Sequence, residues 1–224
     1  MKINQNLLIP SLRTKKSLIA IELLIFIIIN LAWVIIEIPR SIIPFFLFCW
    51  ASLRLRAMSW QKLGLRMPNH LIRTILFGIC LGSLIQIIGL TLIRPLLDRY
   101  FGITSIDPRD FSLLTVSVPL FVLVLLGQWL LAGLGEEAVF RGYLLNRITD
   151  LVGGGTLGLL TSIVVSSTLF SFFHGLIGMP FFVLTFIIGV IYSLVYILTG
   201  RNLWFTIIAH GTANTIGFGL AFLR

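Results

Sequence analysis

Charged residues are scarce in this 224-residue chain. Lys, Arg, Asp and Glu together make up 11% of it, against 58% hydrophobic residues, and the mean hydropathy is +1.05. A soluble domain carries about 25% charged residues, so this composition excludes a soluble globular protein. It predicts an integral membrane protein, in which nearly every stretch between turns is long enough to cross a bilayer.

Cysteine is scarce as well, and repeats are absent from the sequence. Cys49 and Cys80 lie in apolar segments and are not spaced as metal ligands. The sequence therefore offers no disulfide framework, and we expect both cysteines to be packing residues. We find no internal repeat and no low-complexity tail. Because nearly every stretch between turns is long enough to cross a bilayer, the chain has room for one helical bundle and no separate soluble domain.

Acidic residues are the scarcest charged type. Eight Asp and Glu stand against 17 Lys and Arg, which gives a formal net charge of +9. A basic excess can indicate a nucleic-acid partner, but here the Lys and Arg fall in short loops between apolar runs. We interpret them as topology signals. The expected partner is the lipid bilayer, and no nucleic acid is expected.

Seven apolar runs follow one another along the chain. They are 18–38, 42–53, 74–93, 113–134, 157–173, 181–198 and 203–223. Most approach the roughly 20 residues that a spanning helix needs, whereas the second is short enough to be re-entrant. The prediction is an all-α, polytopic transmembrane helix bundle with six to seven spans. Residues 1–112 would supply N-terminal membrane helices and residues 113–224 the core that carries the motifs, in one integral domain.

The distribution of basic residues indicates an orientation in the membrane. If the short run spans, the positive-inside rule places Lys2, Arg13, Lys15, Lys16, Arg54, Arg56, Lys62, Arg66, Arg73, Arg141, Arg147 and Arg201 on one side. Arg40, Arg94, Arg99, Arg109 and Arg224 fall on the opposite side. This imbalance favours seven spans with a cytoplasmic N-terminus, and with the compact size it fits a bacterial inner membrane. The first run is too long for a cleaved signal peptide and is expected to be a retained helix.

Two of the eight acids are adjacent, in the segment 136–141 (EEAVFR). An acid at the centre of a bilayer costs at least about 2.5 kcal/mol, so it is rarely there without a use. Glu137 and Arg141 are four residues apart in the order favoured for a helical ion pair, which would offset the cost of buried charge. Glu136 lies about 100° round an α-helix from Glu137. We interpret Glu136 as the reactive carboxylate; the alternative is an ion-pair cluster that only fixes helix packing.

Two of the three histidines, His174 and His210, lie in or beside apolar runs of the C-terminal half. A lone histidine on an apolar face is more often a hydrogen-bonded packing residue than a ligand, but two histidines plus a diacid favour a site. The turn 153–155 (GGG) should close a helical hairpin. Glu136 lies 19 residues before Gly155 and His174 lies 19 residues after it, so the two side chains should reach a similar depth.

The last run adds a third polar element. His210 and Asn214 are four residues apart and share one helix face. His210 is about nine residues past the turn 200–202, or roughly 13 Å, which is near the middle of a hydrocarbon core of about 30 Å. We expect these polar groups to converge with those of the hairpin. Gly217 continues this face and, with Gly189 and Ser193, predicts close helix packing.

Taken in order, these motifs resemble the CPBP intramembrane protease family, which includes the CAAX-type prenyl endopeptidases and the bacterial Abi proteins. The resemblance covers roughly residues 113–222. It rests on the diacid with Arg141, on Phe170 four residues before His174, and on His210 four residues before Asn214.

Two further segments carry the same resemblance. Residues 186–189 (FIIG), running on to Thr199 and Gly200, are similar to the family's glycine-rich helix, with Ser193 where a second glycine is usual. Residues 60–65 (WQKLGL) are similar to the segment before the family's third helix.

The resemblance implies an intramembrane endopeptidase that acts on a membrane-embedded or lipidated peptide or protein, of CAAX, bacteriocin or another type. It implies that Glu136 and His174 activate a water and that His210 and Asn214 stabilise the oxyanion. Glu136, His174 and His210 would also be an acceptable Zn²⁺ set. Because Asn214 is a poor zinc ligand and a good oxyanion donor, we favour a mechanism without a cofactor, with Zn²⁺ as the alternative.

Two other functional classes stay open. An ion- or proton-coupled transporter would also bury Glu, His and Arg in its helices, although the chain shows no repeat-related halves and no pair of broken helices. The second is a non-proteolytic membrane scaffold or immunity protein of the same fold, although every polar position of the family motif is present here.

Overall fold

The structure, a computed structural model, describes residues 15–36, 41–102, 117–174 and 178–223. These residues form helices joined by turns, and no strand occurs among them. In chain order the helices are α2 (Lys16–Ile36), α3 (Ile43–Leu55), η1 (Trp60–Leu63), α4 (Leu71–Ile88), η2 (Gly89–Ile93), α5 (Arg94–Phe101), α6 (Val118–Gly127), η4 (Gln128–Leu145), α7 (Asn146–Val152), α8 (Gly155–His174), α9 (Met179–Leu198) and α10 (Trp204–Phe222). The all-α prediction is confirmed.

Four helical segments of the described residues are long and apolar enough to cross a membrane. They are Leu71–Phe101, Val118–Val152, Gly155–His174 and Met179–Leu198. Helices α2 and α10, with 21 and 19 residues, are about as long as the segments Gly155–His174 and Met179–Leu198. Many large apolar side chains point away from the protein, as expected where lipid is the solvent. The chain is an integral membrane helix bundle, and the count of six to seven spans stays a prediction.

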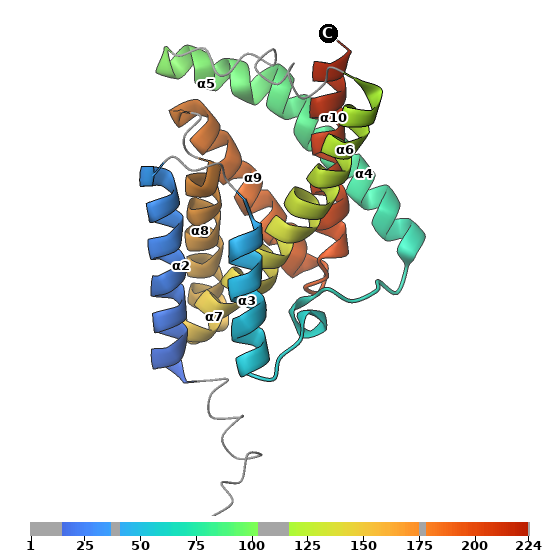
Figure 1. Ribbon diagram of the computed structural model, residues 1–224. Coiled ribbons are helices and arrows are strands. Elements are labelled where there is room, and N and C mark those ends of the chain that lie inside the picture. The colour runs from blue at the N-terminus through green and yellow to red at the C-terminus, as the bar shows by residue number, and fades with distance from the viewer. Residues whose placement is uncertain (1–14, 37–40, 103–116, 175–177, 224) are drawn as a thin grey trace, which may run out of the picture.

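Successive helices alternate in direction through the bundle (Figure 1). The short helix α3 begins at the end of the bundle where α2 finishes. It runs back antiparallel to α2 and does not reverse direction as a re-entrant segment would. Its 13 residues span about 20 Å at 1.5 Å per residue. The C-terminus lies at the end of the bundle opposite to the Lys16 end of α2 (Figure 1).

The expectation that the basic residues lie in loops is wrong for several of them. Arg94 and Arg99 belong to α5, which continues the α4 helix, and Arg141 and Arg147 lie in η4 and α7. The last two are each 1% exposed, because each guanidinium meets a carboxylate of its own helix. Of the predicted topology signals, Lys2, Arg13, Arg40, Arg109 and Arg224 lie outside the described residues.

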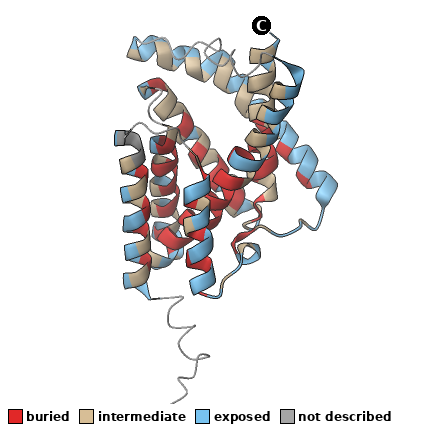
Figure 2. Ribbon diagram, in the orientation of Figure 1, coloured by how far each residue is buried: buried red, intermediate tan, exposed pale blue. Residues whose placement is uncertain are grey.

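The core is an aromatic cluster that joins both halves of the chain. The ring of Phe140 in η4 packs against Phe26 of α2 and against Phe170 and Phe173 of α8, with centroid distances of 6.0, 5.1 and 5.8 Å. Phe45 of α3 closes the group, 5.0 Å from Phe26. Buried residues concentrate where η4, α7 and α8 meet, whereas the outer faces of α2 and α4 are exposed (Figure 2). Helix η4 is therefore held from several sides.

The predicted glycine turn closes the hairpin between α7 and α8. Gly153, Gly154 and Gly155 have φ values of +110°, +76° and +64°, a left-handed region that glycine adopts without steric cost. Three such residues in succession let the chain reverse at the surface and enter α8. The hairpin prediction is confirmed, and it sets the relative position of η4 and α8.

The predicted close packing of small residues is also present. A β-carbon on Gly189 of α9 would lie 3.0 Å from the Cβ of Ser167 on α8, and one on Gly217 would lie 2.9 Å from the Nε2 of Gln86 on α4. Ser193 donates a hydrogen bond to the carbonyl of Gly189 at 2.8 Å. The contact at Gly189 brings α9 close to α8, and the contact at Gly217 brings α10 close to α4.

Candidate active site

The diacid lies in a helix that is unusually wide. Helices α6, η4 and α7 form one continuous 35-residue segment, Val118–Val152, and η4 has the i→i+5 hydrogen bonds of a π-helix. π-Helical turns are rare and are frequently found at functional sites. The α-helical angle expected between Glu136 and Glu137 is thus wrong, because a π-turn spreads its residues differently round the axis. Both side chains are buried, with Glu136 7% and Glu137 0% exposed.

Glu137 bonds to two partners, the guanidinium of Arg141 and the imidazole of His210. Its Oε1 lies 2.9 Å from Nη1 of Arg141, so the predicted ion pair is formed. The same oxygen lies 2.9 Å from Nδ1 of His210 on α10. This second contact was not expected from the sequence, because it joins residues of two distant helices. Glu137 therefore fixes both the guanidinium and one imidazole, which offsets the cost of burying its charge.

Arg141 is held between two aromatic rings. Its guanidinium carbon lies 4.4 Å from the ring centroid of Phe170 and 5.3 Å from that of Tyr192, within the range of cation–π attraction. Its Nη2 also donates to the carbonyl of Gly189 at 3.4 Å. Phe170, singled out by its spacing from His174, therefore stacks on the cation that neutralises Glu137.

Glu136 faces both histidines. Its Oε2 lies 3.8 Å from Nε2 of His174 and 3.9 Å from Nε2 of His210. This oxygen is buried and has no hydrogen-bond partner among the described residues. The counting of residues about Gly155 thus placed Glu136 and His174 correctly at one depth. Separations somewhat longer than a direct hydrogen bond are typical of groups bridged by water.

The second nitrogen of each imidazole has an acceptor that fixes its hydrogen. Nδ1 of His174 donates to the carbonyl of Phe170 at 2.8 Å, and Nδ1 of His210 donates to Glu137 at 2.9 Å. A carbonyl or a carboxylate can only accept, so the proton is assigned to Nδ1 in both rings. Both Nε2 atoms are thereby directed at Glu136, in an arrangement suited to binding and polarising a small polar molecule.

Asn214 lies one turn beyond His210, as predicted, and its amide is oriented by a residue that the sequence did not reveal. Nδ2 of Asn214 donates to Oε1 of Gln128 at 3.0 Å. The next residue, Trp129, donates from Nε1 to Thr215 at 3.0 Å. These two bonds tie the start of η4 to α10. In the sequence Gln128 is a polar residue inside the apolar run 113–134, and periodicity alone does not connect it to Asn214.

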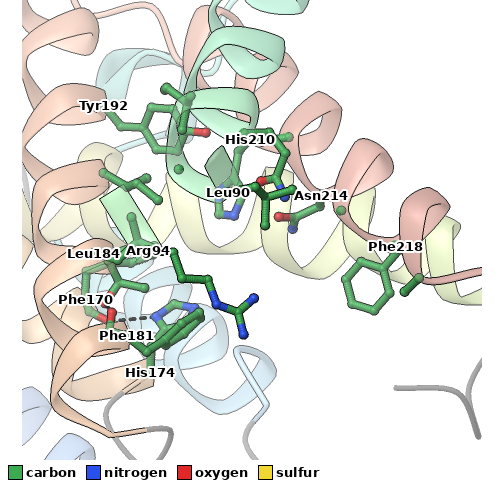
Figure 3. Close-up of a pocket in the computed structure, with 18 residues that line it drawn as sticks. Leu90, Arg94, Phe170, His174, Phe181, Leu184, Tyr192, His210, Asn214 and Phe218 are labelled. Carbon is green, nitrogen blue, oxygen red and sulfur yellow. Dashed lines mark hydrogen bonds between the residues drawn. The ribbon is translucent and has the colours of Figure 1, made fainter. Parts of the chain in front are cut away.

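A cavity of about 260 Å³ opens from the two histidines (Figure 3). His174, His210 and Asn214 line it together with mainly apolar side chains of α4, η2, α9 and α10, among them Leu90 and Leu184. Arg94, expected in a loop, also lines it, and its guanidinium lies on the same side as His174 in Figure 3. The cavity is therefore apolar along its walls and polar at the end that holds the histidines.

Glu136, His174 and His210 are the residues of the alternative zinc set. Among the described residues, no group of three or more His, Cys, Asp and Glu side chains is arranged to hold a metal ion. Glu136, His174 and His210 approach one another, but Asn214 adds an amide, which is a weak ligand for zinc. The side chains of Glu136, His174, His210 and Asn214 can carry acid–base chemistry by themselves.

These features define an integral membrane helix bundle with a buried acid–base cluster at the end of an apolar cavity. Residues 118–216 match a family model described as Type II CAAX prenyl endopeptidase Rce1-like. The matched segment runs from the start of α6 into α10 and contains Glu136, His174, His210 and Asn214. The match confirms the resemblance to the CPBP proteases over this segment and supports a membrane endopeptidase. No curated protein and no solved structure matches the chain.

Proposed function

We propose that the chain is an intramembrane endopeptidase that hydrolyses a peptide bond of a membrane-embedded or lipidated substrate. The observation that supports this most directly is the position of Glu136. Its buried Oε2 lies within 3.9 Å of the Nε2 atoms of His174 and His210, and these two imidazoles line the apolar cavity. A carboxylate and an imidazole at this separation can hold one water between them and remove its proton.

In the first step the water donates one hydrogen to Glu136 Oε2 and the other to Nε2 of His174. Glu136 takes the proton as the water oxygen attacks the carbonyl carbon of the substrate, which gives a tetrahedral oxyanion. The Nδ1 bond of His174 to the Phe170 carbonyl, 2.8 Å long, keeps this imidazole in the tautomer that accepts from water. Glu136 and His174 therefore share the work of positioning the nucleophile.

His210 and Asn214 would stabilise the oxyanion. Nδ2 of Asn214 has two hydrogens, and Gln128 accepts one of them, which leaves the amide oriented to donate the other. His210 can donate through Nε2 when its imidazole is doubly protonated, and the Glu137 carboxylate at Nδ1 balances that charge. Donors fixed before the reaction stabilise developing charge without reorganising.

In the last step the carbon–nitrogen bond breaks and the proton held by Glu136 passes to the leaving amine. The products are a new carboxylate and a new amine, and the carboxylate of Glu136 is regenerated. The apolar walls of the cavity would accept side chains or a lipid group of the substrate, because such groups bind favourably away from water. The physiological location proposed for this reaction is a bacterial inner membrane, with the N-terminus in the cytoplasm.

The test is cleavage of a membrane-inserted peptide library by the purified protein in liposomes, with products identified by mass spectrometry. Glu136→Gln and His174→Ala are expected to abolish cleavage. His70→Ala is the matched control, because His70 is exposed and does not line the cavity; it should keep full activity. An ion flux that depends on Glu136, with no cleavage of any peptide, would instead identify a transporter. The absence of both activities in folded protein would favour the scaffold.

A further inference from the structure

A second cavity lies at the opposite end of the molecule from the C-terminus. It has a volume of about 460 Å³ and is lined by Met58, Lys62, Arg147, Thr149, Asp150, Gly153 and Gly154; we call it the basic groove. Its lining residues come from the turn that follows α3, from η1, from α7 and from the glycine turn after α7. It contains none of the residues of the candidate active site.

Arg147 supplies a buried cation to the basic groove. The residue is 1% exposed, with Nη1 3.2 Å from Oδ2 of Asp150 and Nη2 3.1 Å from Sδ of Met58. Its Nε is buried and has no hydrogen-bond partner among the described residues. A buried donor of a charged group without an acceptor is costly, and a bound anion is one way to satisfy it.

Further positive charge surrounds the basic groove. Lys62 lines it and is exposed. A β-carbon on Gly153 would lie 3.8 Å from Nζ of Lys16, so this second lysine reaches the glycine turn that forms one wall. Asp150, whose side chain is 50% exposed, is the acid of the group. These three cations and one anion leave a net positive charge of two around the basic groove.

We propose that the basic groove binds the phosphate group of an anionic phospholipid. The groove lies at the ends of helices, where lipid headgroups lie beside a spanning bundle, and on the side that the basic residues mark as facing the anionic cytoplasmic leaflet. Arg and Lys around a phosphate form charge-assisted hydrogen bonds. Leu55 at the end of α3, three residues before Met58, is apolar and exposed and would lie beside the acyl chains.

The experiment measures binding of phosphatidylglycerol and of phosphatidylcholine to the purified full-length protein by native mass spectrometry in detergent. Phosphatidylglycerol should bind more tightly. Lys62→Gln should weaken that binding about fivefold, the effect of one cation near an anionic headgroup. Arg54→Gln removes the same charge from the same end of the molecule but from outside the groove, and it should leave the affinity unchanged.

Three outcomes would overturn the proposal. Equal losses in Lys62→Gln and Arg54→Gln would mean that lipid is attracted by the overall charge and not by the groove. Equal affinity for the two lipids would remove the role of the anionic headgroup. Displacement of phosphatidylglycerol by millimolar inorganic phosphate would identify free phosphate as the ligand. Because Lys62 is exposed, its variant tests the groove even where Arg147→Gln fails to fold.

Discussion

At the scale of single residues, the partners of the two adjacent glutamates set their roles apart. Glu137 is fully buried and bonded to both Arg141 and His210. Oε2 of Glu136 faces the histidines without a direct hydrogen bond from any described residue. These partners support the proposal that Glu137 stabilises the cluster and that Glu136 acts on a bound molecule.

The first prediction separates the two glutamates. Glu137→Gln should lower the free energy of unfolding by about 3–5 kcal/mol, because it leaves the buried Arg141 without its counter-ion; activity should fall only in part. Glu136→Gln should abolish turnover and leave the melting temperature nearly unchanged. Thermal unfolding and peptide cleavage, measured on the same two preparations, check both halves. Equal losses of stability would show that the division is wrong.

The second prediction concerns metal and Asn214. In the metal-free scheme the purified enzyme keeps its activity after chelation and dialysis, and elemental analysis finds well under one zinc per chain. Asn214→Asp should lower the rate by about 10²–10³, because a carboxylate repels the oxyanion to which the amide donates. The exposed Asn69→Asp is the matched control and should have no effect. Activity that is lost with chelator and restored by Zn²⁺ would establish a metalloprotease.

At the scale of helices, the site depends on close approach between η4 and α10. Gly211 packs against the ring of Trp129, and a β-carbon there would lie 2.5 Å from Cε3 of that ring. The ring cannot move aside easily, because its Nε1 is bonded to Thr215. The absence of a side chain at Gly211 thus lets α10 approach η4 closely enough for His210 to bond to Glu137 and Asn214 to Gln128.

The third prediction compares two glycines of α10. Gly211→Ala should destabilise the protein by about 1–3 kcal/mol through overpacking and should lower activity, because it pushes α10 away from η4. A β-carbon on Gly219 has nothing within 4 Å, so Gly219→Ala should stabilise the helix by up to about 1 kcal/mol. Melting temperatures of the two variants check this. The prediction fails if both changes shift the melting temperature in the same direction.

Much of this arrangement could be predicted, because each helix carries its own pattern. Residue counts about the glycine turn were enough to bring Glu136 and His174 to one depth, and i, i+4 spacing was enough to pair Glu137 with Arg141. The contacts of Gln128 with Asn214 and of Glu137 with His210 join residues 86 and 73 positions apart. Helical periodicity describes one face of one helix and does not say which neighbour that face meets.

Two further features could not be predicted from the sequence, for a related reason. The π-helical form of η4 depends on packing around the whole segment, and apolar periodicity does not separate it from an α-helix. Arg94 looked like a loop residue because it follows an apolar run, yet α5 continues α4 and carries it to the cavity wall. A charge at the end of an apolar run is compatible with a loop or with a helix that lines a polar space.

At the scale of the whole molecule, the basic residues are distributed unevenly between the two ends of the bundle. Lys16 lies at the end of the bundle opposite to the C-terminus (Figure 1). Helix α7, which lines the basic groove, and the C-terminal end of α3 lie at that same end. Arg94 and Arg99 of α5 lie toward the other end. The positive-inside rule predicts that the first of these ends faces the cytoplasm.

The fourth prediction follows from that asymmetry. A reporter fused to the N-terminus should be cytoplasmic, and one fused to the C-terminus should lie on the other side of the membrane. Paired fusions to alkaline phosphatase, active outside the cytoplasm, and to a fluorescent protein, active inside it, measure both ends. Two termini on the same side would require an even number of spans and would contradict the seven-span arrangement.

The central claim is that a water held between Glu136 and the histidines attacks the substrate directly. The most direct test is a single turnover in water enriched in ¹⁸O, with enzyme in excess over peptide. Direct attack by water should place one ¹⁸O atom in each new carboxyl group and none in Glu136, as read by mass spectrometry of the product and of the digested enzyme. An unlabelled product together with ¹⁸O in Glu136 would mean that the carboxylate itself attacks the peptide, and would rule out direct attack by water.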